Sequence, residues 1–146
     1  MAGGSSTSLI PECPEQPVAI MALALTPGVA NDIAFSLKNP ELQDCYISKV
    51  VIVISTAGGT AGSHFDVGIA DDASGSGLAV NIFDDVDLNS PGLLDSWIPS
   101  DGGLQQKWIL WKNDGSGSYI VGKIVDANAS SLSGTAYITY ILNTYV

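Results

Sequence analysis

The chain has 146 residues, 46% of them hydrophobic, contains no arginine and carries a formal net charge of −10. This length suits one domain with a well-buried core, and the apolar content excludes a wholly disordered chain. The charge and the lack of arginine exclude nucleic-acid binding, because phosphate and base contacts need basic side chains.

The first 17 residues predict a flexible, extended N-terminal arm. Residues 1–8 are small and polar, and a proline then recurs at every third position, which favours a polyproline-like segment over sheet pairing. An apolar tip on such a segment suits contact with a neighbouring subunit or a capsid, although a plain disordered leader fits equally well. The candidate contact residues of this terminal arm are Leu9, Ile10, Pro11, Pro14 and Pro17.

The apolar run 17–25 is the longest near the N-terminus. It is far shorter than the ~20 residues that cross a bilayer, and no basic residue precedes it as in a signal peptide. We therefore expect that the protein does not contact a membrane. We also expect that it is made in the host cytoplasm and is not exported.

Apolar runs separated by Gly-, Ser- and Asp-rich turns predict about eight β-strands and no amphipathic helix. These strands are 18–25, 33–37, 46–55, 64–70, 78–83, 105–111, 119–125 and 135–142. The 46–55 strand is apolar on both faces, which predicts a central strand covered on both sides. Residues 84–89 predict a single helical turn or an acidic loop, and 91–103 a long connection. The predicted fold class is all-β, a single jelly-roll-like β-sandwich over 18–146.

No catalytic constellation is found in the sequence. The only histidine, His64, follows Ser63, but neighbouring strand residues point to opposite faces, so the two cannot form a nucleophile–base pair. We predict no enzyme activity and no cofactor. Turn carboxylates could bind Ca²⁺, but no EF-hand pattern is present and solvated turns are the preferred interpretation. These carboxylates are Asp71, Asp72, Asp84, Asp85, Asp87, Asp114 and Asp126.

Two cysteines, Cys13 and Cys45, have neither metal-site spacing nor a neighbouring histidine. Free thiols in a reducing compartment are the preferred interpretation, and a disulfide between the terminal arm and the domain stays open. Exposed aromatic side chains could also stack on sugar rings, and the candidates for such a glycan site are Trp97 and Trp111.

Four strand and turn motifs occur in a recognisable order. They are FSLKNP at 35–40, YISKVVIVISTA at 46–57, FDVGIADD at 65–72 and GTAYITY at 134–140. This order resembles small β-sandwich proteins of tailed bacteriophages that decorate or cement the capsid. The resemblance implies a structural virion protein on the outer capsid surface, bound to the major capsid protein and to copies of itself, often as a homotrimer. The alternative is a carbohydrate-binding module of a fibre or spike.

Overall fold

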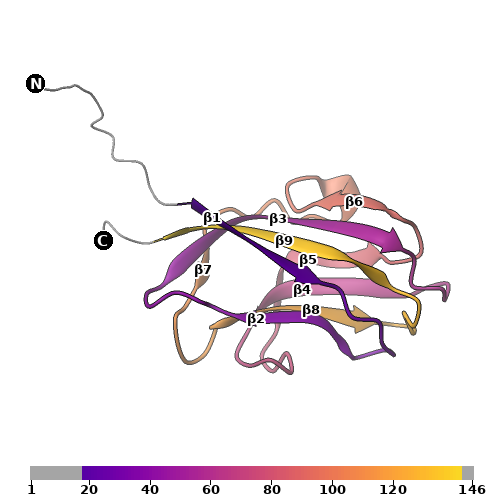
Figure 1. Cartoon of the computed structure of the whole chain (residues 1–146), viewed down its shortest axis with the longest axis horizontal. Coiled ribbons are helices and arrows are strands. Elements are labelled where there is room, and N and C mark those ends of the chain that lie inside the picture. Colours follow the sequence, from indigo (N-terminus) through magenta and orange to yellow (C-terminus); the bar gives the residue numbers. More distant parts are fainter. Residues whose placement is uncertain (1–17, 143–146) are drawn as a thin grey trace, which may run out of the picture.

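The computed structural model describes residues 18–142, and within them the fold is a sandwich of two antiparallel sheets (Figure 1). The strands are β1 (Val18–Ala24), β2 (Ile33–Lys38), β3 (Cys45–Thr56), β4 (His64–Ala70), β5 (Ala79–Asp87), β6 (Gly92–Asp95), β7 (Ile109–Trp111), β8 (Tyr119–Val125) and β9 (Ser133–Leu142). A single 3₁₀ turn, η1 (Pro99–Asp101), follows β6. The predicted all-β sandwich is therefore confirmed.

The strand order is that of a jelly roll. The first sheet runs β1-β9-β3-β6, with β7 also paired to β3, and the second sheet runs β2-β8-β4-β5. The chain crosses repeatedly between the sheets, so strands distant in sequence become neighbours, as in a pair of nested Greek keys. The longest ladder joins β3 to β9. Apolar side chains from the facing sides of both sheets form one core between them.

Strand β3 buries only one of its two faces. Val50, Ile52 and Ile54 point into the core and are almost fully buried, whereas Val51 and Val53 on the opposite face are half-buried. The prediction that this strand is covered on both sides is therefore wrong. Its second apolar face belongs to the outside of the first sheet, where residues 18–142 place no further layer.

A glycine in β8 makes room for a phenylalanine ring of the neighbouring strand β2. Phe35 of β2 and Phe65 of β4 meet edge to face, with ring centroids 5.9 Å apart. A Cβ atom on Gly122 would lie 2.2 Å from the Phe35 ring, so only glycine leaves room for that ring. Such edge-to-face pairs stabilise beyond the area that they bury.

The acidic segment that follows the expected 78–83 strand continues as strand, so the predicted helical turn or loop at 84–89 is wrong. Strand β5 extends to Asp87 across register shifts against β4, and Asp85 lies there at a φ of 56°. The predicted long connection 91–103 contains the short strand β6. Strand β7 is shorter than predicted because Gln105 and Trp108 adopt φ values of 58° and 60°, which interrupt extended backbone.

Within residues 18–142, none of the helical segments has the length and apolar character to cross a membrane.

Candidate interaction surface

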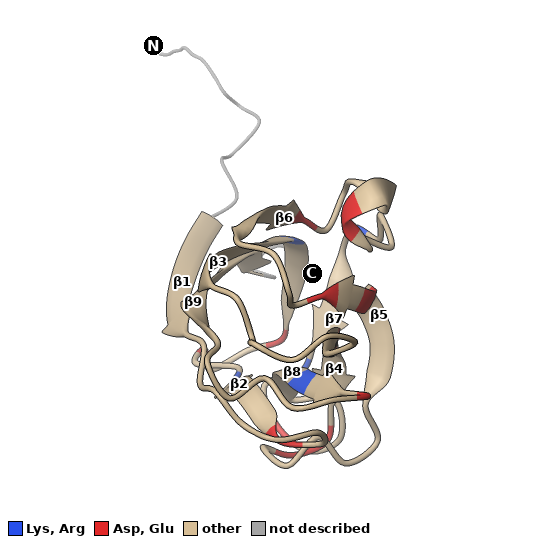
Figure 2. Cartoon of the chain, turned by 90° about the vertical axis from the view of Figure 1, so that its right-hand side faces the viewer, with Lys and Arg blue, Asp and Glu red and all other residues tan. Residues whose placement is uncertain are grey.

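Charge is distributed unequally between the two sheets. The strands of the first sheet contain only Lys49 and Asp95 as charged residues, whereas the second sheet carries four aspartates and two lysines. Figure 2 shows β1 and β9 without any charged position and the acidic positions on β5 and in the loops. A negatively charged partner, including a second copy of this chain, meets least repulsion at the first sheet.

The outward side of the first sheet is mainly apolar, and we call it the outer face. The strand registers place its members in rows across the sheet, such as Ala22, Tyr137 and Val51. The most exposed members are Ile20 on β1, with 64% of its surface exposed, and Leu93 on β6, with 62%. The uncharged members of the outer face are Val18, Ile20, Ala22, Ala24, Tyr46, Val51, Val53, Leu93, Leu110, Thr135, Tyr137, Thr139 and Ile141. The registers also place Lys49 opposite Thr139 and Asp95 opposite Val51, so both charged residues of this sheet lie on the outer face. Contiguous exposed apolar surface of this kind marks interaction sites.

The two charges of the first sheet neutralise each other within the outer face. Lys49 Nζ lies 2.9 Å from Asp95 Oδ2 and also 5.0 Å from the ring centroid of Trp97. A second lysine, Lys107, places its Nζ 4.7 Å from the same centroid, and the indole N–H donates to the Ser48 carbonyl at 2.8 Å. Cation–π contacts and this hydrogen bond fix the indole. Trp97 is thus exposed in part, but it is already in contact with two ammonium groups.

Trp111 cannot stack on a glycan, so this part of the sugar-binding interpretation is wrong. Its side chain is fully buried, meets Tyr140 edge to face at 5.3 Å and donates its indole N–H to the Ser118 carbonyl at 2.9 Å. The Tyr140 hydroxyl in turn donates to Glu41 at 2.9 Å, and burial together with this hydrogen bond raises the pKa of Tyr140. Trp111, the last residue of β7, is therefore a core residue.

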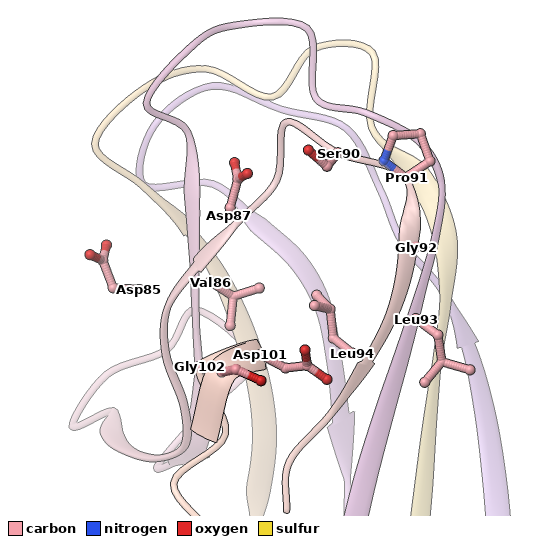
Figure 3. Close-up of a pocket in the computed structure, with 11 residues that line it drawn as sticks. Asp85, Val86, Asp87, Ser90, Pro91, Gly92, Leu93, Leu94, Asp101 and Gly102 are labelled. Atoms are coloured by element: carbon pink, nitrogen blue, oxygen red, sulfur yellow. The ribbon is translucent and has the colours of Figure 1, made fainter. Parts of the chain in front are cut away.

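A hollow of about 360 Å³ lies between the edge strands β5 and β6. It is lined by Asp85, Val86, Asp87, Ser90, Pro91, Gly92, Leu93, Leu94, Ser100, Asp101 and Gly102. Figure 3 shows the Asp85 carboxylate directed away from the other lining side chains. Asp101 has a structural role, because its Oδ2 accepts a hydrogen bond from the Asp95 N–H at 3.1 Å. The lining residues include three carboxylates and no aromatic ring, which is unlike a sugar-stacking site.

Asp85 belongs to a cluster around the only histidine. Nδ1 of His64 lies 2.9 Å from Asp126 Oδ2 and 3.2 Å from Asp85 Oδ1. Both carboxylates approach the same ring nitrogen, as they do when it is protonated, and the hydrogen bond to Asp126 is the main cause that raises the pKa of His64. The three side chains also offer ligand atoms within 4.8 Å of one another, the spacing that a metal ion requires. Ion pairing accounts for the geometry without a metal.

The neighbouring Asp66 is also perturbed. It projects from the same side of β4 as His64, and its Oδ1 accepts the backbone N–H of Asp85 at 3.0 Å. Burial raises the pKa of the Asp66 carboxyl, and the surrounding carboxylates Asp84 and Asp85 add to the effect. Several like charges are thus held together at this end of the second sheet.

Three of the other candidate calcium ligands, Asp71, Asp72 and Asp114, belong to different loops and have protein partners. Asp72 accepts hydrogen bonds from Ser74 and Ser76, and these bonds, that of the Ser74 hydroxyl first, lower its pKa to about 2. Asp71 Oδ1 accepts the Gly117 N–H at 3.0 Å. Asp114 pairs with a lysine of β2 at 3.2 Å. Asp84 and Asp87 belong to β5 beside Asp85, and the charge of Asp87 adds to the causes that raise the pKa of His64. The predicted carboxylates are thus divided between the His64 cluster and separate loops.

Two sets of predicted residues cannot be placed. The terminal arm, with Leu9, Ile10, Pro11, Pro14 and Pro17, lies outside the described residues. Cys13 lies there too, so its pairing stays a prediction. Cys45 is buried next to Asn39, and this burial raises the pKa of its thiol.

Sequence comparison identifies no relatives. No protein-family model matches the chain, and no curated protein matches it significantly. Comparison with solved structures finds similar chains in two phage capsids. A chain of the capsid of Ralstonia phage GP4 is 12% identical with a TM-score of 0.55, and the match covers 92% of this chain and 90% of that one. A chain of the cyanophage Pam1 capsid asymmetric unit is 12% identical with a TM-score of 0.45, covering 96% and 97%.

Proposed function

We propose that this chain is a structural virion protein that decorates and cements the outer surface of a tailed-phage head. The observation that supports this most is the likeness in fold, over nearly the whole length of both chains, to a protein of the Ralstonia phage GP4 capsid. The order of strand and turn motifs separately resembles phage proteins that decorate or cement the capsid. Jelly rolls host many functions, so the likeness supports the role without assigning it.

The surface chemistry is consistent with this role. A cementing protein binds through many weak contacts whose joint strength arises from repetition on the shell. The apolar outer face provides a surface for protein contact, and the acidic charge suits a place away from packaged DNA. In this proposal the partners are the major capsid protein and further copies of the chain, arranged as homotrimers, and no substrate is turned over.

The terminal arm is proposed to hold the protein on the shell. Its length of 17 residues allows a reach of up to roughly 55–60 Å when extended, enough to cross onto a neighbouring capsid subunit. In this proposal Leu9 and Ile10 provide the apolar contact, and the three prolines keep the segment extended.

A reconstitution experiment tests the proposal. Heads of the encoding phage assembled without this protein are mixed with the purified full-length chain or with a variant lacking residues 1–17. We expect the full chain to co-sediment with heads and to raise the temperature at which they release DNA, and the shortened variant to bind more weakly with an unchanged circular-dichroism spectrum. Heads that bind neither protein would refute the decoration role, and equal binding of both would refute the role of the arm.

The carbohydrate-binding alternative has no observation in its favour. One of its two stacking residues, Trp111, is buried, and the other, Trp97, already contacts two lysines.

A further inference from the structure

Strand β1 is an edge strand that lacks the usual protection against pairing. It is bonded to β9 on one side, and no other strand of residues 18–142 lies on its other side. Figure 2 shows it at the left-hand limit of the first sheet. Its sequence, VAIMALA, contains no charge and no proline, and its register with β9 is continuous. Natural edge strands normally carry lysine, proline or a bulge, because an open apolar edge pairs with other chains.

The remaining edge strands do carry such protection. Strand β2 ends in Lys38, and β5 has three aspartates and register shifts. Strands β6 and β7, which both pair only with β3, are short, with four and three residues. Strand β2 also leaves β1 accessible, since a hollow of about 350 Å³ separates it from the C-terminal half of β1. Among the edge strands that the structure describes, β1 is thus the one best suited to pair with a further strand.

The free hydrogen-bonding groups of β1 can be identified from its pairing with β9. Just beyond the strand, the Leu25 N–H donates to the Gly134 carbonyl at 2.9 Å, so this residue directs its backbone groups toward β9. Successive strand residues direct these groups to opposite sides. The residues that face away from β9 are therefore Val18, Ile20, Ala22 and Ala24. The same four residues carry the side chains of β1 that belong to the outer face.

We propose that β1 pairs antiparallel with β1 of a second copy of this chain, about a two-fold axis at Met21. In this register Val18 lies opposite Ala24 and Ile20 opposite Ala22, so every backbone group directed at the open edge finds a partner. The two first sheets join into one continuous sheet, and the two outer faces form one apolar surface. The contact is isologous, so it closes after two copies and does not grow into a fibre.

Charge and sequence point to a second copy as the occupant. A basic partner is drawn to the acidic second sheet and loops rather than to β1, which is uncharged. Two copies with a net charge of −10 each repel one another, and an uncharged edge is where that repulsion is smallest. The terminal arm is a poor alternative, because Pro11, Pro14 and Pro17 lack the N–H groups that an added strand must donate.

This contact is argued from the strand edge and does not rest on the capsid role. It is also separate from the threefold contact of the proposed trimer: the two-fold contact joins neighbouring trimers, or makes dimers where no trimer forms. Because the charges repel, added salt should strengthen the association, whereas salt weakens a complex held by opposite charges.

The test uses purified full-length protein in the absence of capsids, so its outcome is independent of the proposed function. Hydrogen exchange is followed residue by residue over a range of protein concentrations, and mass is measured by sedimentation equilibrium. We expect the amides of Ile20 and Ala22 to become protected as concentration rises. The amides of Met21 and Leu23, which already face β9, should be protected at every concentration.

A matched pair of variants tests whether the contact between copies lies at β1. Ile20→Lys and Leu93→Lys change equally exposed apolar residues and alter the net charge equally, but Leu93 lies on β6 at the far side of the sheet. Because each two-fold contact contains residue 20 twice, Ile20→Lys should raise the dissociation constant of the two-fold step roughly 2- to 30-fold. Leu93→Lys should leave that step unchanged.

Three results would overturn the inference. They are a monomer at all concentrations up to the millimolar range, association without added protection at Ile20 and Ala22, and equal weakening by the two lysine variants.

Discussion

The burial of Trp111 leads to a prediction that separates a core residue from a ligand-stacking residue. Trp111→Ala removes a fully buried indole, its edge-to-face contact with Tyr140 and its hydrogen bond to the Ser118 carbonyl. That carbonyl keeps a second donor, the Asn39 N–H at 2.8 Å, so the lost bond contributes little and the cavity contributes most. We expect a loss of about 3–5 kcal/mol in the free energy of unfolding.

The control is a tryptophan three residues earlier. Trp108 is 57% exposed, and Trp108→Ala should change the free energy of unfolding by about 0.5 kcal/mol or less. Urea denaturation followed by far-ultraviolet circular dichroism gives both values, and thermal midpoints should fall by roughly 6–20 °C for Trp111→Ala. If the two variants lose the same stability, or if Trp108→Ala loses more, the placement of Trp111 in the core is wrong.

Three further predictions concern the second sheet. Gly122→Ala should lower the free energy of unfolding by about 1–3 kcal/mol, because its Cβ would overlap the Phe35 ring, and urea denaturation measures this. The hydrogen bond from His64 to Asp126 raises the pKa of the histidine. This interaction therefore stabilises the fold fully below the unfolded pKa of about 6.5, and the stabilisation is lost as the pH rises through the higher folded pKa. His64→Gln should make the free energy of unfolding depend less on pH in this window. Asp66→Asn should stabilise the protein at pH 7, since the raised pKa shows that the folded state disfavours this carboxylate, and the gain should vanish on acidification.

Each of these has an outcome that would contradict it. Unchanged stability of Gly122→Ala would mean that β8 can move away from β2. If the free energy of unfolding of His64→Gln depends on pH as it does in the unsubstituted protein, His64 does not contribute to the pH dependence. A lower melting temperature for Asp66→Asn at pH 7 would show that its carboxylate stabilises more through the Asp85 N–H than it loses through burial.

Most strands were predictable because their residues alternate or are continuously apolar. The strand at 64–70 shows this best, since its predicted bounds coincide with those of β4. Which face of β3 is turned to solvent was not predictable, because the hydrophobicity of Val51 and Val53 predicts that they are buried as well. Which apolar face enters the core depends on the layer that covers it, and that is a property of the assembled sheets.

The acidic end of β5 was missed for a different reason. Aspartates are disfavoured in strands, and the register shifts against β4 interrupt the alternation that would otherwise reveal a strand. The cluster of His64, Asp85 and Asp126 was also beyond the sequence, because its members come from β4, from β5 and from the end of β8, 21 and 62 positions away from the histidine. Only the jelly-roll order, which places β4 between β5 and β8, brings them together.

The pairing of Val18 with Ile141 has a practical consequence for engineering. The first and last described strands run antiparallel, so the two ends of the described chain leave the sandwich at one corner (Figure 1). A fluorescent protein or peptide epitope joined directly before Val18 or directly after Leu142 would start at that corner, next to the start of β1. Cargo that must not crowd this corner is better inserted at the opposite tip, in the turn between β3 and β4.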